Sequence, residues 1–313
     1  MITSHSERST EITRLLNAGL SAEQIANKCE IKQSTVRRYI RFIKSRFLSK
    51  KEVTKNPKIL LLDIETLPCL ATIWGIYEQR IPAENILRDW FILSWSAKYL
   101  YSGKMMSDVL TSEEVIKNED KRLLGGIWEL INESDIIIGQ NLKKFDLRKL
   151  NARFIINKFP PPLPYQTIDT LTECRKYFAF TSYKLDYINK ILGLRRKVGT
   201  SYELWLKCLT GDPESLKQME VYNRQDVLIL EDLYTTIRGW IKSGPNLGLY
   251  YDTDGASVCP NCGSTSLEWK GYYYTGAGRF KSGRCNNCTA VFRSRYSDLS
   301  KEEKKSLLST IAR

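Results

Sequence analysis

Two carboxylates directly follow an apolar run in the stretch Ile59-Leu60-Leu61-Leu62-Asp63-Ile64-Glu65-Thr66. The unbroken apolar run is typical of a strand that is buried on both faces in the middle of a sheet. Asp63 and Glu65 are two residues apart, so on a strand their side chains point to the same face. Buried carboxylates without a partner are costly, so we expect a cation to compensate them. The alternative is a strand that simply ends here, with both carboxylates solvated.

Three later residues could join this pair. Asp146 follows a short apolar strand and opens a predicted helix, where helix capping is the alternative to a role in chemistry. Tyr222 and Asp226 are four residues apart in Tyr222-Asn223-Arg224-Gln225-Asp226 and share one face of a predicted helix. That spacing is also frequent on solvated helices, so its meaning depends on the other carboxylates.

Together these residues resemble the three motifs of the DEDD 3′→5′ exonucleases, proofreading-type enzymes of the ribonuclease H-like superfamily. The motifs are Asp63-x-Glu65 at the end of a first strand, Asn141-x4-Asp146 after a later strand, and Tyr222-x3-Asp226 on a late helix. The resemblance extends over roughly residues 57–240 and is especially close to predicted exonucleases of bacteria and their viruses. It implies an α/β fold with a mixed, ribonuclease H-like sheet flanked by helices.

The resemblance also implies a two-metal mechanism. Two divalent ions about 3.5–4 Å apart can supply a hydroxide nucleophile and stabilise charge on the leaving oxygen. Oxygen ligands suit Mg²⁺ or Mn²⁺ and do not suit zinc. By resemblance, Asp63 bridges both ions, Glu65 and Asp226 complete the nucleophile-side ion, and Asp146 holds the second ion largely through water. Tyr222 orients the attacking water, which assigns the chain to the tyrosine subclass.

Some features limit the resemblance or have a structural alternative. The residues after Glu65 are Thr66-Leu67-Pro68, where proofreading enzymes often carry a second Thr and a Gly, so recognition of the terminal nucleotide is in question. We interpret Asp169 as a helix cap or structural carboxylate and not as a metal ligand. Four cations near the motifs could contact phosphates or could be solvated surface residues: Lys143, Lys144, Arg148 and Lys184.

Four of the eight cysteines form a second candidate metal site. Cys259 and Cys262 make one CxxC knuckle, Cys285 and Cys288 make another, and 22 residues separate the two knuckles. This spacing predicts one structural Zn²⁺ bound by four thiolates in a zinc ribbon with two strands, over residues 269–274 and 280–284. A redox CxxC is the alternative. The other four cysteines are scattered among apolar neighbours and read as buried free thiols.

The predicted ribbon carries interleaved cations and aromatic residues, a pattern typical of nucleic-acid platforms. The set comprises Lys270, Tyr272, Tyr273, Tyr274, Arg279, Lys281, Arg284, Phe292, Arg293 and Arg295. The same aromatic residues could instead form the small core of the ribbon, so the ribbon could bind nucleic acid or protein.

The N-terminal residues predict three short helices arranged as a helix-turn-helix. Ser21 is a plausible N-cap of the second helix, with Ile25, Ala26 and Cys29 facing inward. Val36 of the third helix faces inward as well. Its polar face is predicted to contact DNA through Gln33, Ser34, Thr35, Arg37, Arg38 and Arg41. A helical protein-protein module with a solvated basic face is the alternative.

The remaining pattern predicts the architecture that must position these groups. Strands come first, over residues 59–66, 90–100 and 105–110, and strands then alternate with helices, as in an α/β domain. Ser112 with Glu114 is predicted to open one long amphipathic helix that reaches Ile131. We predict a helix-turn-helix over residues 1–52, an exonuclease domain over 56–243, and a zinc ribbon over 250–297 with a helical tail to residue 313.

The composition of the chain limits the classes of molecule that it is expected to bind. The 313 residues carry 48 Lys and Arg against 35 Asp and Glu, a net charge of +13, which favours a polyanion such as nucleic acid. The helix-turn-helix favours DNA over RNA. No stretch approaches the roughly 18 apolar residues of a membrane span, and the polar residues 1–13 lack the apolar core of a secretory signal. We expect a cytoplasmic protein of a bacterial or virus-infected bacterial cell.

The sequence thus predicts a metal-dependent 3′→5′ exonuclease. Its single histidine, His5, lies outside the predicted folded body, which excludes a mechanism that needs a catalytic histidine. Two rivals remain. One is a catalytically silent nucleic-acid-binding or assembly protein built on the exonuclease scaffold, and the other is a structure-specific endonuclease that uses the same metals.

Overall fold

The computed structural model describes Leu15 and residues 20–37, 56–78, 80–197, 199–251, 253 and 255–308. The chain divides into two compact units, Met1–Val53 and Thr54–Arg313, which we describe separately. Within the described ranges, no helix combines the length and the apolar character that crossing a bilayer requires.

The described part of the N-terminal unit is helical and has a small apolar core. Helix α2 (Ala22–Cys29) begins with a capping box in which Ser21 and Gln24 exchange hydrogen bonds, as the predicted N-cap requires. Leu15, Ile25, Ala26 and Val36 are buried together. Residues 33–37 are helical, and Ser34 and Arg37 are exposed while Gln33 and Thr35 are half-buried. The predicted contacts Arg38 and Arg41 lie outside the described residues.

A five-stranded mixed sheet forms the centre of the second unit, in the order β5-β4-β1-β6-β7. These strands are β1 (Ile59–Thr66), β4 (Ile92–Tyr99), β5 (Met105–Val109), β6 (Ile136–Gly139) and β7 (Gln166–Asp169). The central strand β1 pairs antiparallel with β4 and parallel with β6. This sheet confirms the predicted mixed α/β fold class.

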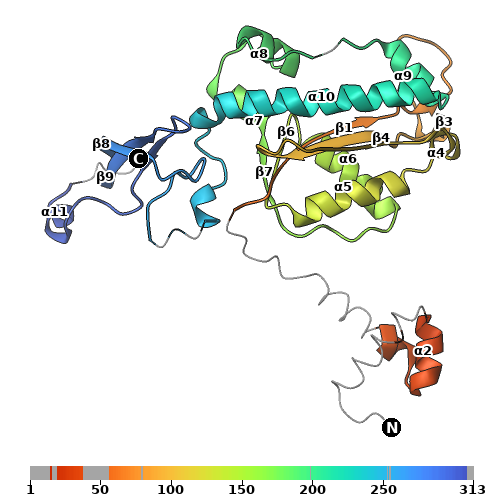
Figure 1. Cartoon of the computed structure of the whole chain (residues 1–313), viewed down its shortest axis with the longest axis horizontal. Coiled ribbons are helices and arrows are strands. Elements are labelled where there is room, and N and C mark those ends of the chain that lie inside the picture. Colours follow the sequence, from red (N-terminus) through yellow and green to blue (C-terminus); the bar gives the residue numbers. More distant parts are fainter. Residues whose placement is uncertain are drawn as a thin grey trace. The chain divides into compact units, whose positions relative to one another are not determined.

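Helices cover both faces of the sheet (Figure 1). Helices α5 (Lys121–Glu133) and α6 (Asp146–Ile156) lie on one face. The 25-residue α10 (Pro213–Ile237) lies on the other, with α7 (Thr170–Tyr177), α8 (Leu185–Ile191) and α9 (Tyr202–Leu209) packed around it. Leu60 and Leu62 of β1 pack in the cluster that contains the α5 residues, whereas Leu61 packs with Val227 and Leu230 of α10. The apolar run is therefore buried on both faces, as predicted.

The predicted helix begins at Ser112, as expected, but it does not run unbroken to Ile131. Thr111 is the N-cap, because its hydroxyl accepts from Glu114 N–H while the Glu114 carboxylate accepts from Thr111 N–H. The helix is then broken. α4 (Ser112–Lys117) ends where Asn118 adopts a left-handed conformation, with φ of 58°, and α5 starts anew at Lys121.

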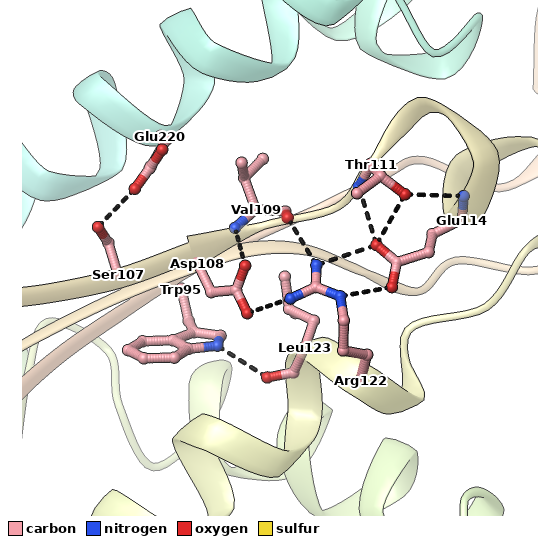
Figure 2. Close-up of polar contacts among 9 residues, drawn as sticks. All are labelled: Trp95, Ser107, Asp108, Val109, Thr111, Glu114, Arg122, Leu123 and Glu220. Carbon is pink, nitrogen blue, oxygen red and sulfur yellow. Dashed lines mark hydrogen bonds and ion pairs between the residues drawn. The ribbon is translucent and has the colours of Figure 1, made fainter.

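The edge strand β5 is tied to both helical layers by polar contacts (Figure 2). Ser107 donates to Glu220 of α10, with an O–O distance of 2.6 Å. The next residue, Asp108, points to the other face and accepts from Arg122 of α5, which also binds the Glu114 carboxylate. In the adjacent strand, the Trp95 indole donates to the Leu123 carbonyl oxygen at 2.8 Å. Alternation along the strands thus sends successive side chains to opposite helical layers.

Smaller elements complete the unit. β2 (Leu70–Ala71), the short helix η1 (Ala83–Asn85) and β3 (Ile86–Arg88) lie between β1 and β4. A three-stranded antiparallel sheet near the C-terminus consists of β8 (Leu267–Thr275), β9 (Gly278–Cys285) and β10 (Val291–Arg293). The short helices η2 (Arg238–Trp240), η3 (Leu247–Leu249) and α11 (Lys301–Lys305) precede and follow it.

The C-terminal sheet is docked on the end of α10. The Asn261 amide donates to the carbonyl oxygens of Arg238 and Ile241, at 2.9 and 2.8 Å. Gly239 packs so closely on the second knuckle that a Cβ there would lie 2.4 Å from the Cys288 carbonyl oxygen. Both cysteine knuckles therefore contact the segment that follows α10. Strands β8 and β9 lie beyond this end of α10 (Figure 1).

Candidate active site

Three carboxylates converge where α10 crosses β1. Asp63 and Glu65 lie on one face of the strand, and Asp226 faces them from the helix. One oxygen atom from each of the three lies within 4.8 Å of the others. Asp226 is buried, and the other two are half-buried. The alternative of a strand end with solvated carboxylates is therefore wrong.

Asp146 lies beside this cluster but not within it. It is the first residue of α6 and is buried at the helix N-terminus. Its Oδ1 accepts a hydrogen bond from the backbone N–H of Ile64 at 3.2 Å. Because Ile64 stands between Asp63 and Glu65, this bond holds Asp146 against the strand that carries the other two carboxylates.

A polar loop delivers Asp146 to this position. Asn141 adopts a left-handed conformation, with φ of 61°, and its N–H donates to Asp169, as does the N–H of Lys143. The Asp169 carboxylate also accepts from Leu171 and Thr172 at the start of α7. Asp169 is thus a helix cap that organises the loop, as predicted.

Tyr222 lies one turn before Asp226 on α10, so the two side chains share a face of the helix. Its ring is 7% exposed and meets Trp205 of α9 edge-on, with ring centroids 5.9 Å apart. This contact fixes the ring beside the carboxylates.

Lys197 is a member of the site that the sequence analysis missed. Its Nζ lies 2.5 Å from Asp226 Oδ2 and 4.2 Å from the centroid of the Tyr222 ring. It comes from the segment between α8 and α9, which has no periodic pattern, so no local signal marks it.

Asn223 is a second residue that the sequence analysis missed. Its side-chain amide donates to Asp63 Oδ2 at 2.6 Å, and its Oδ1 accepts from Ser94 on β4 at 3.4 Å. Asn223 is fully buried. The Tyr222-x3-Asp226 spacing contains this residue, but it draws attention only to the two ends of the motif.

The cluster is electrostatically strained without a bound cation. Burial, followed by repulsion from Asp146 and Asp226, raises the pKa of Asp63 well above its usual range. Burial raises the pKa of Glu65 to about 7 and that of Asp146 to about 8. Burial also raises the pKa of Asp226, against the lowering effect of the Lys197 ammonium. One lysine therefore offsets only part of the repulsion among four carboxylates.

The residues fit a divalent metal. All three convergent ligands are oxygen donors, the set that Mg²⁺ and Mn²⁺ prefer. Asp226 Oδ1 is buried and has no hydrogen-bond partner among the described residues. A buried acceptor without a donor is costly, and a cation would satisfy it.

A cationic hollow of about 640 Å³ adjoins the carboxylates through Lys197. Arg175 and Lys184 also line it. The other predicted phosphate contacts, Lys143, Lys144 and Arg148, are exposed near the N-terminus of α6. Of the four predicted phosphate contacts, Lys184 is thus the one that lines the same hollow as Lys197.

The four clustered cysteines also converge. One sulfur atom from each of Cys259, Cys262, Cys285 and Cys288 lies within 4.8 Å of the others. The Cys259–Cys288 and Cys262–Cys285 sulfur distances are 3.5 and 3.6 Å. Tetrahedral zinc with Zn–S bonds of about 2.3 Å spaces its sulfur ligands by roughly 3.8 Å, so the site fits zinc. Burial alone would raise the pKa of the Cys285 thiol, but the amides of Cys288 and Asn287 help lower it to about 7.

A comparison with protein families agrees with the architecture of the second unit. Residues 100–238 match the family model RNase_H_2, described as RNase_H superfamily. The sheet of this unit is ribonuclease H-like. The matched range includes Asp146, Tyr222 and Asp226, and it begins after β1, which carries Asp63 and Glu65.

One similar solved structure is the family B DNA polymerase from the hyperthermophilic archaeon Pyrobaculum calidifontis, with a TM-score of 0.43 and 16% sequence identity. The similarity covers 59% of this chain and 25% of the polymerase chain, so this protein spans about a quarter of that length. No curated protein matches the sequence.

Proposed function

We propose that this protein is a metal-dependent 3′→5′ exonuclease that hydrolyses phosphodiester bonds of nucleic acid. The observation that carries the proposal is the convergence of Asp63, Glu65 and Asp226, with Asp146 hydrogen-bonded to the backbone between the first two. Four buried or half-buried carboxylates with raised pKa values are expected where a site is built for divalent cations.

In this proposal, Asp63, Glu65 and Asp226 would hold one divalent ion, and Asp63 with Asp146, the latter largely through water, would hold a second one. Bound Mg²⁺ or Mn²⁺ would supply a hydroxide nucleophile and stabilise charge on the leaving oxygen. Asn223 orients Asp63 through the 2.6 Å hydrogen bond. Burial keeps the pKa of Tyr222 above its usual range, so its hydroxyl stays protonated and can donate to the attacking water.

The substrate would be a polyanion that enters over the basic hollow. Arg175 and Lys184 line that hollow and could contact phosphates on the way to the carboxylates. The N-terminal helices, as a helix-turn-helix, and the Cys₄ ribbon would hold or select the nucleic acid, with DNA favoured over RNA. Zinc would have a structural role in the ribbon.

The experiment is hydrolysis of 5′-labelled single-stranded DNA and RNA with Mg²⁺ or Mn²⁺. We expect a ladder of products shortened from the 3′ end, abolished in Asp63→Ala and Asp226→Ala. Glu214→Gln is the matched control, because Glu214 is an exposed carboxylate of α10. Cleavage of closed circular substrates would instead favour a structure-specific endonuclease. Binding without cleavage under both metals would favour the silent scaffold.

A further inference from the structure

Two tyrosines of the β8–β9 hairpin face outward. Tyr272 and Tyr274 are 48% and 69% exposed, and their ring centroids are 6.5 Å apart. Residues two apart on a strand share a face. The ribbon core consists of Cys259, Cys285, Cys288, Ala290 and Phe292, and among the described residues it includes neither tyrosine. The alternative that these two aromatics form the ribbon core is therefore wrong.

Cations lie directly opposite these tyrosines. Tyr272 pairs across the hairpin with Lys281, and Tyr274 pairs with Arg279. Directly opposed residues of antiparallel strands lie on the same face. The Arg279 guanidinium lies 5.0 Å from the centroid of the Tyr272 ring. We call these four residues, Tyr272, Tyr274, Arg279 and Lys281, the hairpin patch.

One acid moderates the charge of the hairpin patch. Asp298 binds Arg279 at 3.2 Å and lies 3.9 Å from the Lys281 ammonium. Lys281 nevertheless remains 63% exposed. The three strands of the ribbon carry five cations, namely Lys270, Arg279, Lys281, Arg284 and Arg293, against the single acid Glu268. The surface therefore suits a polyanion.

We propose that the hairpin patch binds single-stranded nucleic acid. Bases would stack on Tyr272 and Tyr274, while Lys281 and Arg279 contact phosphates, an arrangement that tolerates any base sequence. Bases within a duplex are already stacked, so the tyrosines favour an unpaired strand. This inference deepens the proposed function, because it gives the hydrolysed strand a second contact away from the carboxylates. The inference rests on the proposed function in one respect only, namely that the strand bound by the hairpin patch is the strand that is hydrolysed.

The test is binding of a fluorescent single-stranded oligonucleotide to the full zinc-loaded chain, measured by anisotropy without Mg²⁺ or Mn²⁺. We expect the double variant Tyr272→Ala/Tyr274→Ala to bind at least about fivefold more weakly for each base that loses its stack. Tyr272→Phe/Tyr274→Phe should bind like the original protein, because the rings remain. Tyr202→Ala is the matched control, since Tyr202 is also 69% exposed but lies on α9.

Two further readouts keep the result interpretable. Zinc content and thermal stability of the double alanine variant should equal those of the original protein, because both side chains are outside the core. Cleavage of a dinucleotide, which is too short to span two sites, should be unchanged. Equal affinity of the alanine and original proteins would overturn the proposal. Loss of binding with no cleavage by any form of the protein would support the hairpin patch and overturn the exonuclease.

Discussion

The Lys197 ammonium lies 2.5 Å from Asp226 Oδ2, at the edge of the three-carboxylate cluster. Asp226 is also one of the residues that we propose as metal ligands. A lysine and a divalent cation therefore compete for Asp226, and the cation must overcome the repulsion of the ammonium.

Removal of that ammonium should strengthen metal binding. We expect Lys197→Met to bind Mn²⁺ about fivefold more tightly, because two unit charges about 4 Å apart repel by roughly 1 kcal/mol even in bulk water. Calorimetric titration of the metal-free site measures this change. Lys207→Met is the control, since Lys207 is exposed and pairs with Glu203 on α9. Unchanged or weaker binding in Lys197→Met would contradict the competition.

Two substitutions of Asp146 can separate the effect of its charge from the effect of its hydrogen bond to Ile64 N–H. Asp146→Asn keeps an oxygen that can accept from Ile64 N–H, so we expect its thermal stability to change little at about pH 4 to 5, where the Asp146 carboxyl of the folded protein is protonated. We expect hydrolysis near neutral pH to fall by on the order of 10²-fold or more. Asp146→Ala leaves the Ile64 N–H without its acceptor and should also lose roughly 1–3 kcal/mol of unfolding free energy. Thermal melts and single-turnover cleavage distinguish the two effects. Full activity in Asp146→Asn would remove Asp146 from the proposed machinery.

The raised carboxylate pKa values predict an unusual pH dependence for the metal-free protein. Burial raises the pKa of Glu65 to about 7 and that of Asp146 to about 8, above the value of about 4 expected for an unfolded chain. The folded state therefore binds more protons than the unfolded state between these pH values. The stability contributed by these groups is present at about pH 4 and is lost as the pH rises through about 7 to 8.

The measurement is a series of melts from about pH 5 to about pH 9, with and without Mn²⁺. We expect the melting temperature to fall with pH in the absence of metal, and Mn²⁺ to restore it most at high pH, where the ligands are deprotonated. Glu65→Gln and Asp146→Asn should flatten the slope. A flat profile for the original protein would contradict the assignment of these pKa shifts.

The absence of a side chain at Gly239 allows the second cysteine knuckle to pack closely on the segment that follows α10. A Cβ at this position would lie 2.4 Å from the Cys288 carbonyl oxygen, a backbone atom that cannot rotate away. We expect Gly239→Ala to cost about 1–3 kcal/mol of unfolding free energy and to speed the release of zinc to a chelator. Gly125→Ala in α5 is the control, because nothing lies within 4 Å of a Cβ there. Equal stability of Gly239→Ala and the original protein would mean that the knuckle is not held against this segment.

Removal of zinc should also lower the stability of the protein, as Gly239→Ala should. Without a metal, four cysteines of a small core face one another, and burial raises the pKa values of Cys259 and Cys288. We expect a chelator that strips zinc to unfold the ribbon and lower the melting temperature, since the metal supplies much of the folding energy of such a module. Circular dichroism measures the unfolding, and the amount of zinc taken up by the chelator measures the loss of metal. Retained ribbon structure after complete zinc loss would contradict a structural role.

Much of the fold follows from local sequence patterns, but the site is only partly predictable. The apolar run of β1 and the alternation of strands and helices indicate the sheet, because burial on both faces requires such residues. The spacing of Asp63 with Glu65, and of Tyr222 with Asp226, follows from strand and helix periodicity. The cysteine spacing is equally local.

Other features depend on tertiary placement or on finer rules. Lys197 meets Asp226 only because the segment after α8 folds back onto α10, and nothing in its neighbours encodes that contact. Thr111 and Ser112 are adjacent before Glu114, and both residue types favour helix caps. The capping-box spacing selects Thr111, which stands three residues before Glu114.

The docking of the ribbon on α10 also sets a length scale. Asp226 and the end of α10 at Ile237 are eleven residues apart, about 16 Å along the helix axis. The β8–β9 hairpin lies beyond this end of α10 (Figure 1), so a strand held at both the carboxylates and the hairpin patch would span a length of this order or more. Degradation should therefore proceed without release while the strand is long enough, and should become distributive once the remaining fragment is too short to reach both sites. In that case the distance between the two sites along α10 would determine the length of the final product.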